Sequence, residues 1–131
     1  MKLLLDTHVL LWALGANDRL PDDVLNEIRS PDNEVLYSAV SIWEIAIKSS
    51  QDRKDFEGHP KVIDDEARDI GLVELPMRAA HAIAVHGLPD IHRDPFDRML
   101  LAQALVEPAW LFTADRQLAR YAGPVRLINP R

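Results

Sequence analysis

The sequence predicts an α/β fold, a three-layer α/β/α sandwich around a mainly parallel, twisted sheet of four to five strands. Short apolar stretches alternate with segments of helical periodicity along the chain, which is typical of parallel sheets. Leu3, Leu4 and Leu5 follow one another with no polar residue between them, which indicates a strand covered on both faces. Two of the apolar stretches run into an aspartate, Asp6 and Asp115, near the point where a strand would give way to a helix.

The N-terminal half is expected to hold two strands and three helices. Apolar residues at helical spacing follow Asp6, so a helix is expected directly after the first strand. Residues 17–21 are typical of a loop, and Pro21 opens a short helix with an acidic first turn. A second strand is expected over Glu34–Tyr37. A largely buried helix follows over Ser38–Ser50, because its apolar positions are nearly continuous.

The C-terminal half is expected to hold four helices and three strands. Asp94 is a good N-cap and Pro95 suits the first position of the helix that continues to about residue 105. Before it, the pattern predicts a mobile polar connection, a helix, a strand and a helix over residues 51–60, 61–70, 72–75 and 77–86. After it come a strand, a short helix and a last strand over residues 109–113, 116–121 and 125–128.

Length and composition describe an ordinary globular protein. The chain of 131 residues suits a single domain over 1–131, with 47% apolar and 27% charged residues. Cysteine is absent from the sequence, which excludes disulfides and thiolate metal sites. The apolar stretches are too short to span a bilayer and the N-terminus does not resemble a signal peptide, so we expect a cytoplasmic protein without membrane association. The net charge of −6 disfavours a broad basic surface for nucleic acid, so any such binding needs local positive charge.

Four acids, which we call the four site acids, are expected to meet in one pocket: Asp6, Glu44, Asp97 and Asp115. Two follow strands, and two lie near the start of helices that leave from the same edge of the sheet, where ligands bind in open α/β folds. Alternatives remain for single residues. Asp6 would also serve as a helix cap, and Asp94 is explained well as one. Glu44 would complete a capping box with Ser41, unless the helix begins at Ser38 and leaves Glu44 buried in need of a partner or cation.

Such a cluster indicates metal chemistry. Neighbouring carboxylates repel one another and raise one another's pKa values unless a cation lies between them. Oxygen ligands without cysteine or an organised histidine set favour Mg²⁺ or Mn²⁺ over Zn²⁺. One or two such ions would activate water for hydrolysis of a phosphodiester, and they would also bridge an acidic protein to an acidic substrate.

Four motifs carry a family resemblance over almost the whole chain: LLLDTHVLLW at 3–12, SAVSIWEIAIK at 38–48, HRDPFDRMLLAQAL at 92–105 and LFTAD at 111–115. Together they resemble PIN-domain ribonucleases, specifically VapC-type toxins of type II toxin–antitoxin systems. The resemblance implies that the four site acids bind Mg²⁺ or Mn²⁺ and that Thr113 orients a carboxylate or water. It also implies that Asp6 lies on the central strand, that the protein is an endoribonuclease and a homodimer, and that a cognate VapB-like antitoxin inhibits it.

Several further residues have two interpretations each. Arg93, Arg98 and Arg116 flank the site acids and are candidates for phosphate contacts, although each would also suit a surface partner of a nearby acid. His8 and His92 lie close to site acids, and we expect hydrogen-bonded bystanders rather than bases.

Two tryptophans and two histidines complete the prediction. Trp12 and Trp43 have apolar neighbours at helical spacing and are assigned to core or dimer contacts. His81 and His86 lie five residues apart and are expected to be surface or partly packed residues.

Other functional classes fit less well. A receiver-type phosphoacceptor domain needs a lysine near the end of a late strand, whereas the last lysine here is Lys61. A phosphatase of the Asp-x-Asp type would have an acid in place of His8, and the glycine-rich turn of a dinucleotide-binding domain is absent from the sequence. The remaining alternative is a catalytically silent PIN-like module that binds RNA or a protein.

Overall fold

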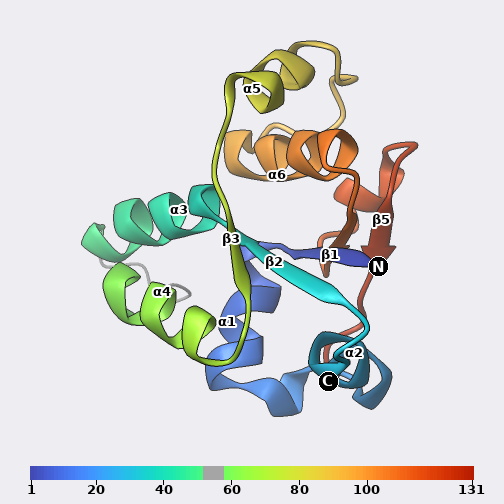
Figure 1. The fold of residues 1–131 in the computed structure, drawn as a ribbon. Helices are drawn as coiled ribbons and strands as arrows, with labels where there is room; N and C mark the ends of the chain where they lie inside the picture. The colour runs from blue at the N-terminus through green and yellow to red at the C-terminus, as the bar shows by residue number, and fades with distance from the viewer. Residues whose placement is uncertain (52–57) are drawn as a thin grey trace.

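The fold is organised around a parallel sheet. It was determined as a computed structural model, which describes residues 1–51 and 58–131. The mobile connection predicted over 51–60 therefore lies mostly outside the described residues. Within them the strands pair in the order β3-β2-β1-β4-β5 and every pairing is parallel (Figure 1). The strands are β1 Lys2–Leu5, β2 Glu34–Ser38, β3 Val73–Leu75, β4 Trp110–Thr113 and β5 Val125–Leu127. The predicted fold class is confirmed, and Asp6 follows the central strand.

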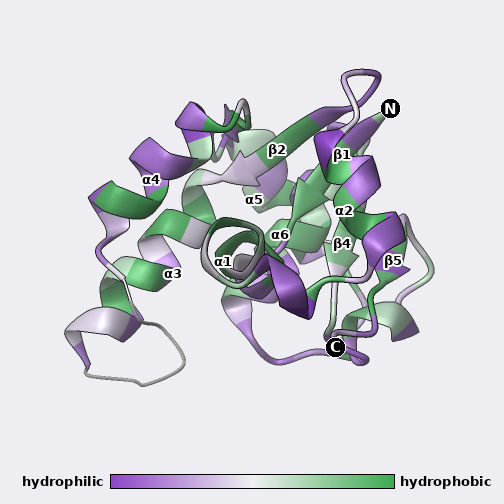
Figure 2. Ribbon diagram, turned by 90° about the horizontal axis from the view of Figure 1, so that it is seen from below, coloured by the Kyte–Doolittle hydropathy of each residue, from purple (hydrophilic) through white to green (hydrophobic). Residues whose placement is uncertain are grey.

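Helices cover both faces of this sheet. The α-helices of the described part are α1 Thr7–Gly15, α2 Asp22–Arg29, α3 Ala39–Ser50, α4 Pro60–Asp69, α5 Ala79–His86 and α6 Pro95–Val106. Figure 1 shows α5 and α6 on one side of the sheet and α1, α2 and α4 on the other, with α3 at its edge. Figure 2 shows that polar and apolar residues alternate along α2 and α4, as expected for helices that lie at the surface.

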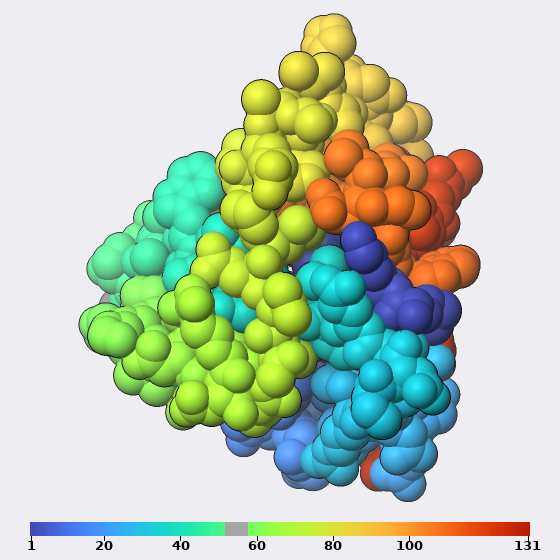
Figure 3. All heavy atoms as spheres, viewed as in Figure 1, coloured from blue at the N-terminus to red at the C-terminus, as the bar shows by residue number. Residues whose placement is uncertain are grey.

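The three leucines of β1 explain why the sheet needs both layers. Leu3 and Leu5 pack with residues of α1, α2 and α4, whereas Leu4 packs with residues of α6 on the opposite face. Successive side chains of a strand point to opposite faces of the sheet. All three side chains are fully buried because helices cover both of these faces. In the space-filling view, the N-terminal residues (dark blue) lie against the β2 region (cyan) and α6 (orange) (Figure 3). Segments distant in sequence are thus brought together around β1.

The structure differs from the prediction in three local features. Residues 17–21 contain a 3₁₀ turn, Asn17–Arg19, and the predicted short helix before Tyr121 is only the 3₁₀ turn Leu118–Arg120. Pro21 lies at the N-cap of α2 and not at its first helical position. The two 3₁₀ turns span three residues each, which is too short for an α-helix, because the first α-helical turn fixes several residues for one hydrogen bond.

Two side chains lie elsewhere than expected. His81 is fully buried, and the surface prediction was wrong because both ring nitrogens find partners: Nδ1 accepts the Arg78 N–H and Nε2 lies 2.8 Å from a Glu107 carboxylate oxygen. Trp43 was assigned to core or dimer contact; it is 56% exposed, so it does not belong to the core, and the dimer contact stays a prediction. Its ring packs edge-on against that of Phe96, with 5.0 Å between the ring centroids.

None of the helices in the described ranges, 1–51 and 58–131, is both long and apolar enough to cross a bilayer.

Candidate metal and active site

The four site acids line one cavity of about 400 Å³. It lies beyond the carboxyl ends of the neighbouring central strands β1 and β4, the place where parallel sheets bind their ligands. The cavity is lined by Asp6, His8, Trp12, Glu44, Lys48, His92, Asp94, Asp97, Ala114 and Asp115. A larger cavity of about 770 Å³ lies at the opposite end of the sheet, next to Val35 at the start of β2, and none of the four site acids lines it.

Asp6 is fixed where β1 gives way to α1. Its backbone N–H donates to the Phe112 carbonyl of β4 at 3.0 Å, and one carboxylate oxygen accepts the Val9 N–H at 2.9 Å. The residue is therefore a helix cap, as the simpler interpretation proposed, and it also faces the cavity. Burial raises the pKa of the Asp6 carboxyl to about 6, although hydrogen bonds from Thr113 and Val9 favour the ionised form.

Glu44 is buried inside α3 and has two partners. Ser38 caps the helix by accepting the Val40 N–H, so the helix begins before Ser41 and the capping-box interpretation of Glu44 is excluded. One carboxylate oxygen accepts the Thr7 hydroxyl at 2.6 Å, and the other lies 2.6 Å from the Lys48 ammonium. These contacts supply the partner that a buried carboxylate needs.

Asp97 lies in the first turn of α6, behind the cap formed by Asp94. One Asp94 carboxylate oxygen accepts the N–H groups of Phe96 and Asp97, at 2.8 and 3.2 Å. The Asp97 side chain is 18% exposed. Burial, followed by the negative charges of Asp94, Asp6, Glu44 and Asp115, raises the pKa of Asp97 to about 8. Asp97 is thus the carboxyl group on which the repulsion within the cluster is concentrated.

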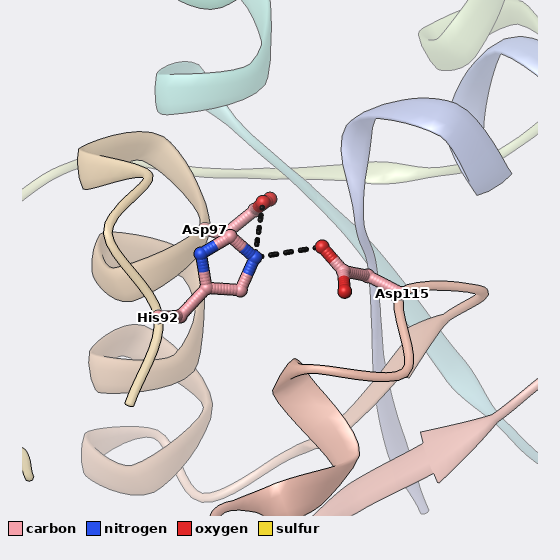
Figure 4. Close-up of side chains that lie close together, drawn as sticks. All are labelled: His92, Asp97 and Asp115. Atoms are coloured by element: carbon pink, nitrogen blue, oxygen red, sulfur yellow. Dashed lines mark hydrogen bonds and ion pairs between the residues drawn. The ribbon is translucent and has the colours of Figure 1, made fainter. Parts of the chain in front are cut away.

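His92 joins two of the acids. Its Nε2 lies 2.7 Å from a carboxylate oxygen of Asp115 and 3.2 Å from one of Asp97 (Figure 4). The ring comes from the loop before α6, Asp97 from α6 and Asp115 from the loop after β4. On the other side of Asp115, its backbone N–H donates to the Thr113 hydroxyl at 2.9 Å. Thr113 therefore contacts both Asp6 and Asp115, the two acids that follow strands.

The three candidate arginines have different surroundings. The Arg98 guanidinium is directed at the carbonyls of Pro89, His92 and Val85 and at the Tyr121 hydroxyl. These bonds hold the loop before α6, so the contacts of Arg98 do not support a role in phosphate binding. Arg93 and Arg116 are exposed, and neither lines the acidic cavity.

Sequence reasoning missed the cationic and aromatic part of the cavity wall. Lys48 was not considered, although its position four residues after Glu44 on one helix face is the spacing of an ion pair. Trp12 was assigned to core or dimer contact; it packs against the core and also lines the cavity, with its ring centroid 6.1 Å from that of His8. The predicted bystander His92 contacts two site acids directly.

The donor set fits a hard divalent cation. Carboxylate oxygens from four separate segments face one cavity, and burial raises the pKa of Asp6 to about 6 and that of Asp97 to about 8. A cation among them would relieve the cost of ionising both groups. Asp6, Glu44, Asp97 and Asp115 are the residues that would hold it, with Lys48 already neutralising part of the charge on Glu44.

Comparisons with known proteins agree with this arrangement. Residues 3–124 match the family model of the PIN domain. The chain is 30% identical over 127 residues to ribonuclease VapC22 of Mycobacterium tuberculosis, which covers 93% of each protein. Its fold is similar to a chain of VapBC2 from Rickettsia felis bound to a promoter DNA fragment, with a TM-score of 0.71 at 16% identity over 98% of this chain and 99% of that chain. It is also similar to a chain of VapBC-1 from nontypeable Haemophilus influenzae, with a TM-score of 0.65 at 15% identity over 97% and 98%. The protein therefore belongs to the PIN-domain family, as a VapC-type member.

Proposed function

We propose that this protein is a metal-dependent endoribonuclease, with Mg²⁺ or Mn²⁺ as cofactor, and the toxin of a VapBC-like toxin–antitoxin pair. The observation that carries the proposal is the gathering of the four site acids around one cavity at the carboxyl end of a parallel sheet. Membership of the PIN-domain family and similarity to a protein named as a ribonuclease support it.

The four site acids are the proposed ligands. When bound, the cation supplies an activated water molecule and stabilises the negative charge that develops on the phosphate. It also answers the objection raised by the net charge of −6, because positive charge is needed only at the point where RNA meets the site. Exposed Arg93 and Arg116 are the proposed contacts to phosphates further along the strand.

The neighbouring side chains hold the ligands in place. The Thr113 hydroxyl links Asp6 to the backbone of Asp115, so the two acids that follow strands are positioned together. Thr7 and Lys48 fix the carboxylate of Glu44 from two sides. Asp97, whose pKa is raised to about 8, would hold a proton at neutral pH in the metal-free protein and would have to lose that proton to ligate a cation.

The test of this function is cleavage of RNA by Asp6→Asn beside the unmodified protein. Asparagine keeps the size of the side chain and an oxygen that accepts the Val9 N–H, so the fold should be retained while metal binding is lost. We expect Mg²⁺- or Mn²⁺-dependent cleavage by the unmodified protein, no cleavage with a chelator, and none by the variant. Asp65→Asn is the matched control, because Asp65 is an exposed acid paired with Lys61 on α4. Full activity of Asp6→Asn would refute the assignment.

A cognate antitoxin is the proposed protein partner. Two structures with a similar fold are named as VapBC assemblies, which supports this proposal. We propose that a basic side chain of the antitoxin reaches the acidic cavity and neutralises it in place of the cation. Titration with a cognate VapB-like antitoxin should suppress cleavage, and undiminished cleavage at saturating antitoxin would contradict this part.

We also propose a homodimer in the cytoplasm. Exposed apolar side chains on and near α3 and α5, those of Trp43, Met77 and Ile83, supply surface for such a contact. Light scattering of the purified protein would measure its oligomeric state, and a monomer at micromolar concentration would contradict the dimer.

The alternative is a catalytically silent module that binds RNA or a protein. The contact between Lys48 and Glu44 favours it, because an ammonium already neutralises one site acid. The same cleavage assay separates the two functions. Binding of RNA without cleavage, in the presence of either metal, would support the silent module and refute the nuclease.

A further inference from the structure

We propose that His92 is a positioning residue that donates its Nε2–H to Asp115, beside Asp97, and that it does not ligate the metal ion. This inference rests on the proposed function, since it concerns the site in which the cation would bind. The three side chains offer ligand atoms that all lie within 4.8 Å of one another, which at first resembles a metal site with one nitrogen and two oxygen ligands. The hydrogen bonds of the ring point to a different role.

The hydrogen-bond partners of the His92 ring define its tautomer. The Asp94 N–H donates to His92 Nδ1 at 3.0 Å. A ring nitrogen that accepts a hydrogen bond carries no proton, so the proton of the neutral ring is on Nε2. Nε2 forms its hydrogen bond with a carboxylate oxygen of Asp115 at 2.7 Å, and an oxygen of Asp97 lies 3.2 Å away. The hydrogen bonds of the two ring nitrogens thus match the Nε2–H tautomer.

Contacts of the backbone and burial of the side chain fix the position of the His92 ring. The backbone N–H of His92 donates to the Tyr121 hydroxyl at 2.8 Å, and the Arg98 guanidinium lies 3.3 Å from the His92 carbonyl oxygen. Arg98 also lies 3.2 Å from the Tyr121 hydroxyl, so Tyr121 and Arg98 together hold the backbone at this point. The side chain of His92 is 10% exposed, which leaves the ring little freedom to turn. The contacts of Arg98 therefore act through His92 on the two acids.

The hydrogen bond that His92 Nδ1 accepts is incompatible with ligation of a metal ion through Nε2. A histidine that binds a metal through one ring nitrogen almost always donates its other N–H to a carbonyl or carboxylate. Here the other ring nitrogen faces a backbone donor instead. Ligation through Nε2 would place a proton on Nδ1 against the Asp94 N–H, and the hydrogen bond would be lost. The backbone of the helix cap thus selects the donor role of His92.

The consequence is a site that presents only oxygen atoms to the cation. The Nε2–H holds the carboxylate of Asp115 beside that of Asp97, and the ring offers no ligand nitrogen to the ion. Hydrogen bonds of this kind orient ligating carboxylates in known metal sites. Without a nitrogen ligand the site should favour Mg²⁺ or Mn²⁺ and gain little from Zn²⁺.

The direct test is the tautomer of His92, read from two-bond ¹H–¹⁵N correlations of the full chain. We expect the Nε2–H pattern in the metal-free protein and the same pattern at saturating Mg²⁺. An Nδ1–H pattern in the metal-free protein would overturn the proposal, as would conversion to that pattern on addition of Mg²⁺. This measurement of the His92 tautomer does not depend on the activity of the protein. Failure of the unmodified protein to bind Mg²⁺ would count against the proposed function, whereas the tautomer in the metal-free protein would still decide the role of His92.

A matched pair of substitutions tests the same point through metal affinity. His92→Gln places an amide donor near the position of Nε2, whereas His92→Asn reaches only the position of Nδ1 and leaves Asp115 without this donor. We expect Mg²⁺ affinity close to that of the unmodified protein for His92→Gln and about 10- to 100-fold weaker for His92→Asn, as for other residues that orient ligands. If His92 were a ligand, both substitutions would weaken Zn²⁺ binding more than Mg²⁺ binding, and that result would overturn the proposal.

Discussion

Replacing Asp97 by asparagine should stabilise the metal-free protein at neutral and alkaline pH. Burial, together with Asp94 and the other three site acids, raises the pKa of Asp97 from its ordinary value of 3.8 to about 8. The folded protein therefore keeps a proton on Asp97 at pH values where the unfolded chain has lost it. Asparagine has the same shape and no charge to bury, so the variant does not carry this cost.

The sign and size of the effect follow from proton linkage. Because the folded pKa lies above the unfolded one, the stability from this group is fully present below pH 3.8 and is lost as the pH rises towards 8. At about 1.4 kcal/mol for each pH unit, roughly three units separate 3.8 from pH 7, so the loss there is about 4 kcal/mol. This is an upper figure, because water entering the site would reduce the cost of the charge.

The assay is urea unfolding with a chelator at pH 5, 7 and 9. The free energy of unfolding should fall with pH more steeply for the unmodified protein than for Asp97→Asn. Asp6, with its raised pKa, contributes to the pH dependence of both proteins, so the difference between them isolates Asp97. Asp65→Asn, at an exposed acid, should behave as the unmodified protein. Parallel curves for the unmodified protein and Asp97→Asn would refute the reasoning.

Two further predictions concern metal binding and the core. The affinity for Mg²⁺ should rise between about pH 6 and pH 8, because Asp6 and Asp97 must lose their protons to bind the ion. Calorimetry in buffers of different ionisation enthalpy would measure the proton release. An affinity for Mg²⁺ that does not depend on pH would contradict this prediction. Leu4→Ala should lower the free energy of unfolding by about 2–5 kcal/mol, because the Leu4 side chain is fully buried between the sheet and α6. Val73→Ala, at a side chain 47% exposed on β3, is its control, and equal losses for both would contradict the assigned core.

The arrangement of the elements was predictable because apolar patterning reports burial directly. Leu3, Leu4 and Leu5 form the central strand, since only a strand between two layers buries three successive apolar residues. Asp94 and Pro95 mark the start of α6 at the expected residues. The convergence of the site acids at one end of the sheet followed from the same rules, although their role as ligands stays a prediction.

The contacts between side chains were not predictable in the same way. His92 lies 23 residues from Asp115, and its position depends on Tyr121 and Arg98, which no local pattern connects to it. His81 was expected to be a surface or partly packed residue, since its partner Glu107 lies at the end of another helix and no local pattern points to that contact. Lys48 differs from these, because its spacing from Glu44 was visible in the sequence. A local signal was present there, whereas for the histidines the tertiary fold alone supplies the partner.

The measurement that tests the central claim most directly is a titration with Mn²⁺ followed by broadening of the backbone amide signals. We predict that the first signals to broaden are those at the four site acids, which lie on four separate segments around one cavity. Amides beside the exposed acids Asp23 and Asp65, on α2 and α4, should be unaffected at the same Mn²⁺ concentration. Equal broadening at those surface acids, with no preference for the cavity, would contradict the claim that these carboxylates share a cation.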